Sequence, residues 1–180
     1  MAKEAGLHIV TALGLMLLAL LFHILPLPEH VMTFLSRFMM TLSSSMAAGI
    51  LCGEGYALLI SLIVPAAAWY LAGDLVSFPA LYIEEAAAAL SGGLTAALFY
   101  RFFNGAVSAC LAGVLMSRII CALTGLILSL VFRNTYYFTE FLNEGIIRVW
   151  PGLVLCGVIL PVLILLFKSA GLMFYFRDER

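Results

Sequence analysis

Charged residues are scarce in this chain. They make up 11% of its 180 residues, and 64% of the residues are hydrophobic, whereas an average soluble domain carries roughly 25% charged residues. Charged residues are too few to form the surface of a soluble domain. The composition therefore indicates an integral membrane protein. The nine lysines and arginines are scattered and the formal net charge is −1. This argues against a nucleic-acid partner, because phosphate binding needs clustered positive charge.

The sequence also lacks the motifs of common enzymes. It contains no Walker A loop, HExxH helix, GxSxG turn or paired-aspartate signature, so we expect no catalysis and no ATP hydrolysis by this chain. The four cysteines form no CxxC pair and fall mostly within apolar runs, which favours small buried side chains over disulfides. His8, His23 and His30 show no metal-ligand spacing. We therefore expect neither a metal nor another cofactor.

Six apolar runs occupy most of the chain. A helix needs about 20 mainly apolar residues to cross a bilayer, and prolines, glycines and short polar segments separate these runs. The sequence therefore predicts a single all-α transmembrane domain over residues 1–180, an integral six-helix bundle in the cell membrane. The predicted spans are residues 7–25, 33–51, 56–72, 81–100, 105–131 and 149–173.

The distribution of basic residues favours cytoplasmic N- and C-termini. In that orientation the cytoplasmic set outnumbers the external set, as the positive-inside rule requires. The connections expected inside, CGEG and RFFNG, are short, whereas those expected outside are longer and richer in polar and aromatic residues. A binding site is most often built on such an elaborated side. The inside set is Lys3, Arg101, Lys168, Arg177 and Arg180, and the outside set is Arg37, Arg133 and Arg148.

Two adjacent glutamates stand near the start of the predicted fourth helix. Below Glu84 and Glu85, at four-residue spacing, the rows 88, 92, 96 and 89, 93, 97 contain only alanine and glycine, whereas positions 90, 94 and 98 are leucine. Small residues pack against other helices and large ones face lipid, so both glutamates head a packing face. They either cap the helix at the membrane interface, where its dipole favours a carboxylate, or line a polar cavity open to the outside.

The predicted fifth helix carries an arginine in its apolar interior. Arg118 follows a stripe of small residues at positions 105, 109, 113 and 117, and a charge near the middle of a span costs roughly 2.5–3.5 kcal/mol to insert. Arg118 is either part of a structural ion pair or a donor to an anionic or carbonyl-bearing ligand, since guanidinium matches carboxylate and phosphate. The remaining candidate ligand contacts are Arg37, Asp74, Tyr136 and Asn143.

Three segments resemble the substrate-specific S components of energy-coupling factor (ECF) transporters. The segment SSSMAAGILCGEGYALLISLIVPAAAWYLAG is similar to the family's small-residue hairpin. SFPALYIEEAAAALSGGLTAALFYR resembles its proline-containing loop and Glu-bearing, Gly-rich fourth helix, and AGVLMSRIICALTG its fifth helix with a small residue before arginine. When the glycine-rich helices are matched, the family's usual glutamate falls on Ala88, one turn below Glu84 and Glu85.

The resemblance implies a membrane subunit that captures a vitamin or related micronutrient outside the cell. Its partners would be a transmembrane coupling subunit and two cytoplasmic ATPase subunits, which would hydrolyse ATP. The ligand would lie between the outer loops and the outer halves of helices four to six. The family's first helix commonly meets the coupling subunit through an Ala-xxx-Ala contact, and the nearest series here is Ala5, Ala12 and Ala19.

Two other functions remain open on the sequence. A small, non-transporting membrane scaffold such as the cell-shape protein MreD has a similar length, hydrophobicity and number of spans. A stand-alone proton- or ion-coupled carrier would use Glu84 or Glu85 as its coupling site. Capture of a small ligand separates the first alternative from an S component, and uptake without ATPase subunits separates the second.

Overall fold

The computed structural model describes residues 2–25, 37–71, 80–132 and 150–169, and all regular structure in these ranges is helical. The predicted all-α class with six helices is confirmed when the last, composite helix counts as one. That helix contains a π-helical turn, η2. The elements are α1 (Ala2–Ile24), α3 (Arg37–Leu51), α4 (Glu54–Leu71), α5 (Ala80–Phe103), α6 (Ala106–Phe132), and the last helix α8 (Trp150–Val154), η2 (Leu155–Ile159) and α9 (Leu160–Ser169).

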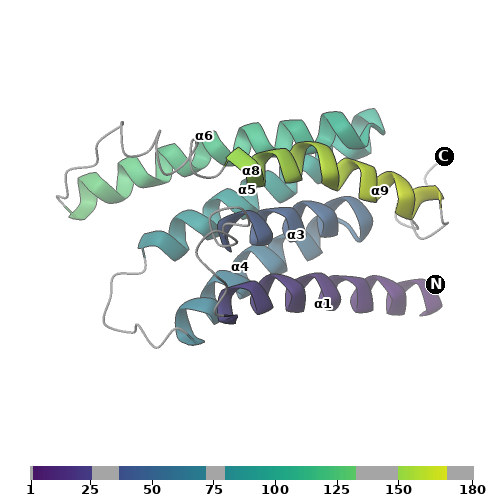
Figure 1. Ribbon diagram of the computed structural model, residues 1–180, viewed down its shortest axis with the longest axis horizontal. Coiled ribbons are helices and arrows are strands. Elements are labelled where there is room, and N and C mark those ends of the chain that lie inside the picture. Colours follow the sequence, from purple (N-terminus) through teal and green to yellow (C-terminus); the bar gives the residue numbers. More distant parts are fainter. Residues whose placement is uncertain (1, 26–36, 72–79, 133–149, 170–180) are drawn as a thin grey trace.

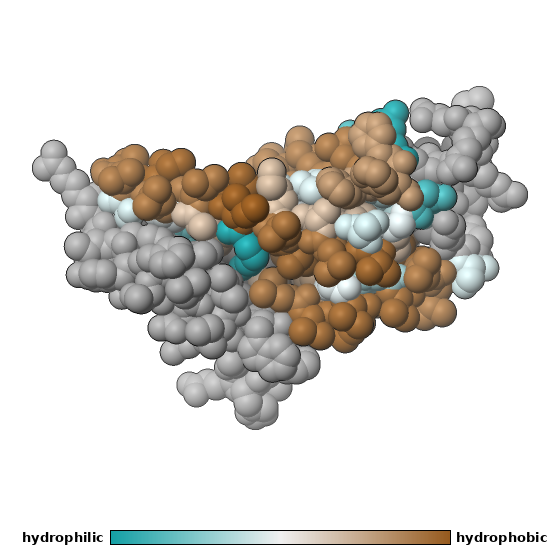
Figure 2. Space-filling view, turned by 90° about the horizontal axis from the view of Figure 1, so that it is seen from above, coloured by the Kyte–Doolittle hydropathy of each residue, from teal (hydrophilic) through white to brown (hydrophobic). Residues whose placement is uncertain are grey.

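Four of the described helices contain a segment long and apolar enough to cross a membrane: α1, α4, α5 and α6. The apolar parts of α3 and of the last helix are shorter, Met39–Leu51 and Gly152–Phe167. Large apolar side chains on the outer sides of α1, α4, α6 and α9 are exposed, and Figure 2 shows hydrophobic surface over much of the described part of one face. Such a surface is compatible with a membrane protein and too apolar for a typical soluble monomer.

Helix α3 lies at the centre of the bundle. It contacts α1, α4, α5 and the last helix, and every residue from Met39 to Gly53 is buried. Because α3 has no face left for lipid, small and polar residues can replace large apolar ones along it. The Ser45 hydroxyl illustrates this: it donates to the Ala89 carbonyl of α5 and lies 2.8 Å from the Ser61 hydroxyl of α4. A buried hydroxyl with such partners avoids the penalty of an unpaired polar group.

Successive helices run in opposite directions, so α1 begins and α9 ends at the same end of the bundle, here called the termini end (Figure 1). Two tight turns lie at this end. In the α3–α4 turn Gly53 has φ 110° and donates to the Ala48 carbonyl. In the α5–α6 turn Asn104 has φ 53°, a left-handed conformation that asparagine tolerates better than most residues. Arg101 Nη1 lies 3.6 Å from Glu54 Oε1 and joins the two turns.

The opposite end of the bundle, here called the distal end, is where α1, α4 and α6 end and α3, α5 and α8 begin (Figure 1). The chain segments 26–36, 72–79 and 133–149 connect these helix ends. They are much longer than the two tight turns at the termini end. The connections between helices are therefore short at one end of the bundle and longer in sequence at the other.

Candidate functional site

Helix α5 packs on two sides through its two rows of small residues. A Cβ added to Gly93 would collide with the Ser45 side chain of α3. One added to Gly92 would collide with the end of the Leu42 side chain of α3 and would lie 3.1 Å from the Gly113 carbonyl oxygen of α6. The row below Glu85 therefore packs between α3 and α4, and the row below Glu84 packs between α3 and α6. This confirms the prediction of two packing rows and adds that they serve different neighbours, because successive helical residues differ in direction by about 100°.

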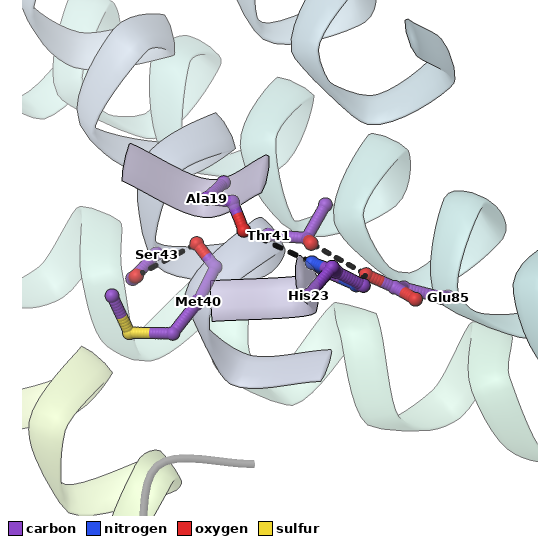
Figure 3. Close-up of polar contacts among 6 residues, drawn as sticks. All are labelled: Ala19, His23, Met40, Thr41, Ser43 and Glu85. Atoms are coloured by element: carbon purple, nitrogen blue, oxygen red, sulfur yellow. Dashed lines mark hydrogen bonds and ion pairs between the residues drawn. The ribbon is translucent and has the colours of Figure 1, made fainter. Parts of the chain in front are cut away.

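The Glu85 side chain is buried between three helices and is 4% exposed. Its Oε1 accepts a hydrogen bond from Thr41 Oγ1 of α3 at 2.5 Å and lies 2.9 Å from His23 Nε2 of α1 (Figure 3). The other ring nitrogen, His23 Nδ1, donates to the Ala19 carbonyl at 2.9 Å. Two helices thus supply partners to one carboxylate oxygen. A ligand would have to displace Thr41 or His23 to reach that atom.

Glu84 lies on the other side of α5 in a half-buried position. It has no hydrogen bond or ion pair within the ranges that the structure describes. On α6, Arg118 is only 9% exposed, and its Nε donates to the Ser117 hydroxyl at 3.4 Å. Glu84 and Arg118 both lie close enough to the Cys121 thiol to act on it electrostatically, and Cys121 packs against Ala88. One acidic and one basic side chain therefore flank the same α5–α6 interface.

The last helix approaches Arg118 with its π-helical turn. Cys156 of η2 lies close enough to Arg118 for an electrostatic interaction, and its thiol is 3.9 Å from the Met39 carbonyl oxygen of α3. Gly152 permits this approach, because a Cβ there would collide with Met39. A π turn rotates the residues that follow it relative to an uninterrupted α-helix, and such turns occur frequently at functional sites.

Four of the predicted ligand contacts cannot be placed beside this pair. Asp74, Tyr136 and Asn143 lie outside the described residues, and so does the side chain of Arg37, with which α3 begins. Their proposed roles stay predictions. The helix ends next to these four residues all lie at the distal end: α4 and α6 end there, and α3, α5 and α8 begin there. Glu84 is also nearer to this end of α5.

Two of the three alanines expected to dock a partner, Ala12 and Ala19, lie inside the bundle. Ala12 is 7% exposed and Ala19 is fully buried, the latter packed against α3 and α4. The outer side of α1 carries large residues such as Val10, which is 65% exposed. Small side chains let two helices approach closely, so the seven-residue spacing positions α1 against its own chain. The side chain of Ala5 lies outside the described residues.

Sequence reasoning missed the roles of His23 and Thr41. The spacing of the histidines bears only on metal ligation, and the sequence does not show that His23 contacts Glu85, because the two residues are 62 positions apart. A signal was nevertheless present, because an ionisable side chain within an apolar span usually faces the bundle interior and has a partner there. The same rule that singled out Arg118 applies to His23.

No protein-family model, no curated protein and no solved structure matches this chain. Within the part that the structure describes, no group of three or more His, Cys, Asp or Glu side chains could hold a metal ion. The functional argument therefore depends on the arrangement of the chain's own residues.

Proposed function

We propose that this chain is the substrate-binding membrane subunit, or S component, of an ECF transporter. It captures a vitamin or related micronutrient outside the cell. The chain itself does not hydrolyse ATP. Uptake is driven by a transmembrane coupling subunit and two cytoplasmic ATPase subunits, with the chain in the plasma membrane and both of its termini in the cytoplasm.

The observation that carries this proposal is the difference between the two ends of the bundle. At the termini end, two tight turns and the Arg101–Glu54 contact hold the helix hairpins together. At the distal end the connections are long, and Glu84 lies within about one turn of the start of α5. A scaffold whose function is only to fill the membrane has no need for this asymmetry, whereas binding residues are commonly carried by loops that a rigid scaffold positions.

The α5–α6 interface supplies the chemistry for ligand capture. Glu84 offers a carboxyl group to a donor, and Arg118 offers a guanidinium group to an anionic or carbonyl oxygen. Glu85 is less suited to direct contact, because His23 and Thr41 already bond to its Oε1. We therefore assign ligand contact to Glu84 and Arg118 and a positioning role to Glu85. Such a site accepts a small molecule that carries a hydrogen-bond donor at one end and a carboxylate or carbonyl group at the other.

Binding of a panel of vitamins to the purified protein tests the proposal. One member of the panel should bind with submicromolar affinity. Arg118→Lys should weaken that binding at least about tenfold, because lysine keeps the charge and loses the planar fork. Arg101→Lys, at the termini end, is the matched control and should leave binding unchanged. The proposal fails if no vitamin binds and no ATPase subunit co-purifies from native membranes, a result that favours a scaffold.

Uptake measurements separate the proposal from a stand-alone carrier. Vesicles that contain this chain alone should accumulate little or none of the ligand, and accumulation should require ATP and the partner subunits. Uptake by the chain alone, driven by a proton or ion gradient, would instead identify a carrier. Uptake that requires ATP and the partner subunits and uptake by the chain alone exclude each other for the same ligand under the same gradient.

A further inference from the structure

The contact between His23 and Glu85 defines where one proton must lie. The Ala19 carbonyl oxygen can only accept a hydrogen bond, so the Nδ1 atom of His23 carries a hydrogen. Its Nε2 then faces Glu85 Oε1 at 2.9 Å. Without a proton between them, a nitrogen lone pair and a carboxylate oxygen would repel each other at this distance. One proton therefore lies between Nε2 and Oε1, bonded to one of the two atoms.

We propose that His23 and Glu85 form a proton-binding site that ties α1 to α5 by one shared proton. With the proton on Nε2, the site is an imidazolium–carboxylate pair. With the proton on Oε1, it is a neutral imidazole that accepts from a neutral carboxylic acid. Both forms carry zero net charge, so neither places an uncompensated charge in the apolar interior. This proton-binding site does not require the proposed function.

Thr41 sets the balance between the two forms. Its hydroxyl donates to the same Oε1 atom, and a hydrogen bond donated to a carboxyl oxygen favours the ionised carboxylate. Thr41 thus shifts the proton toward Nε2 and strengthens the tie between the helices. When the proton moves to Oε1, both partners become neutral, and α1 can separate from α5 without leaving a charge in the bilayer.

The other ionisable groups of the described parts of α1, α3, α4, α5 and α6 lie elsewhere in the bundle. Glu84 precedes the row of α5 that packs between α3 and α6, and both Glu84 and Arg118 act electrostatically on Cys121 of α6. On α1, His8 lies about four helical turns toward the termini end, and the only acidic or basic residue of α4 is Glu54, at the termini end. On α3, Arg37 begins the helix, and its side chain lies outside the described residues.

Nitrogen-15 NMR of the histidine rings in lipid nanodiscs tests this inference. The chain has three histidines, so His23→Gln identifies the His23 signals by their loss. In the native chain the His23 signals should stay constant between about pH 5 and pH 8, where an ordinary histidine titrates. The Nε2 shift should lie between the values of a protonated and an unprotonated nitrogen, as expected for a shared proton.

Three variants decide what holds the proton. Thr41→Val keeps the shape of the side chain and should move the Nε2 shift toward the unprotonated value. Glu85→Gln should move it further, and Glu84→Gln, the matched control, should not move it. The inference is overturned if the native His23 signals titrate in this pH range, or if Nε2 has the same shift in the native chain and in Thr41→Val. The second criterion holds even if Glu85→Gln does not fold.

Discussion

Glu84 and Glu85 are adjacent in sequence, yet they belong to different environments. The rotation of about 100° between successive helical residues turns Glu85 toward α1 and α3, where Thr41 and His23 bond to it. Glu84 faces the α6 side and has no such partner within the described ranges. One glutamate is thus built into the packing of the bundle, and the other is the one to which we assign ligand contact.

The two glutamates should therefore differ in their effect on stability. Glu85→Ala should lower the free energy of unfolding by about 1–3 kcal/mol, because the buried donors on Thr41 and His23 lose their acceptor. Glu84→Ala should change it by less than about 0.5 kcal/mol and should weaken ligand binding instead. Thermal unfolding of both variants in the same detergent provides the comparison. Equal losses of stability would contradict the assignment of separate roles.

Cys52 gives a second prediction at this scale. It lies in the turn between α3 and α4, and burial raises the pKa of its thiol to about 11 from 9.0. The folded chain therefore binds the thiol proton more tightly than the unfolded chain. The resulting contribution to stability is fully present below about pH 9 and is lost as the pH rises toward 11.

Maleimide labelling checks the state of this thiol. In a variant that keeps Cys52 and replaces the other three cysteines by alanine, the thiolate population at pH 8 should be roughly 100-fold below that of the unfolded chain. Labelling of the folded protein should be slower by at least this factor, and denaturant should restore it. Equal rates in the folded and unfolded protein would show that Cys52 is accessible and ionised normally.

At the scale of helices, glycines set how closely α5 approaches its neighbours. A Cβ on Gly113 would lie 2.7 Å from the Gly92 carbonyl oxygen, and one on Gly49 would lie 2.8 Å from that of Gly93. Backbone atoms cannot rotate out of the way as a flexible side chain can. An added methyl group must therefore push two helices apart.

Gly113→Ala should lower the free energy of unfolding by roughly 1–3 kcal/mol through this overpacking. The matched control is Gly14→Ala on α1, where nothing lies within 4 Å of the added Cβ. That change should be neutral or stabilising by up to about 1 kcal/mol, because alanine stabilises a helix more than glycine does. The measurement is the free energy of unfolding of the Gly113→Ala and Gly14→Ala variants under the same conditions. A larger loss for Gly14→Ala than for Gly113→Ala would rule out the described packing.

The helices and the small-residue rows of α5 could be predicted from the sequence because both depend on local periodicity. A run of apolar residues predicts a helix, and four-residue spacing predicts which residues share a face. Which helix each face meets depends on contacts between distant segments. For this reason the pairing of His23 with Glu85 was missed, and the inward direction of Ala12 and Ala19 was not foreseen.

At the scale of the whole molecule, the two ends of the bundle differ. Tight turns and an Arg101–Glu54 contact close the termini end, whereas long connections join the helices at the distal end. Hydrophobic side chains cover the outer sides of the helices between them. This difference between the two ends is the observation on which the proposed function depends.

The proposed orientation, with both termini in the cytoplasm, is open to a direct test. Reporter fusions at the N- and C-termini should both be active only in the cytoplasm. A reporter inserted into the α3–α4 turn, after Gly53, should also be cytoplasmic, because this turn lies at the termini end. Opposite locations for the two terminal fusions would require an odd number of spans and would contradict the six-span topology.

Ligand capture is the central claim, and native mass spectrometry of the protein purified from its own membranes tests it most directly. A bound small molecule should appear as a defined mass added to the 180-residue chain and should be lost on mild activation. The same mass should be absent from an Arg118→Lys preparation and present in the Arg101→Lys control. A chain that carries no added mass in any preparation, and gains none from a panel of vitamins, would contradict the proposed function.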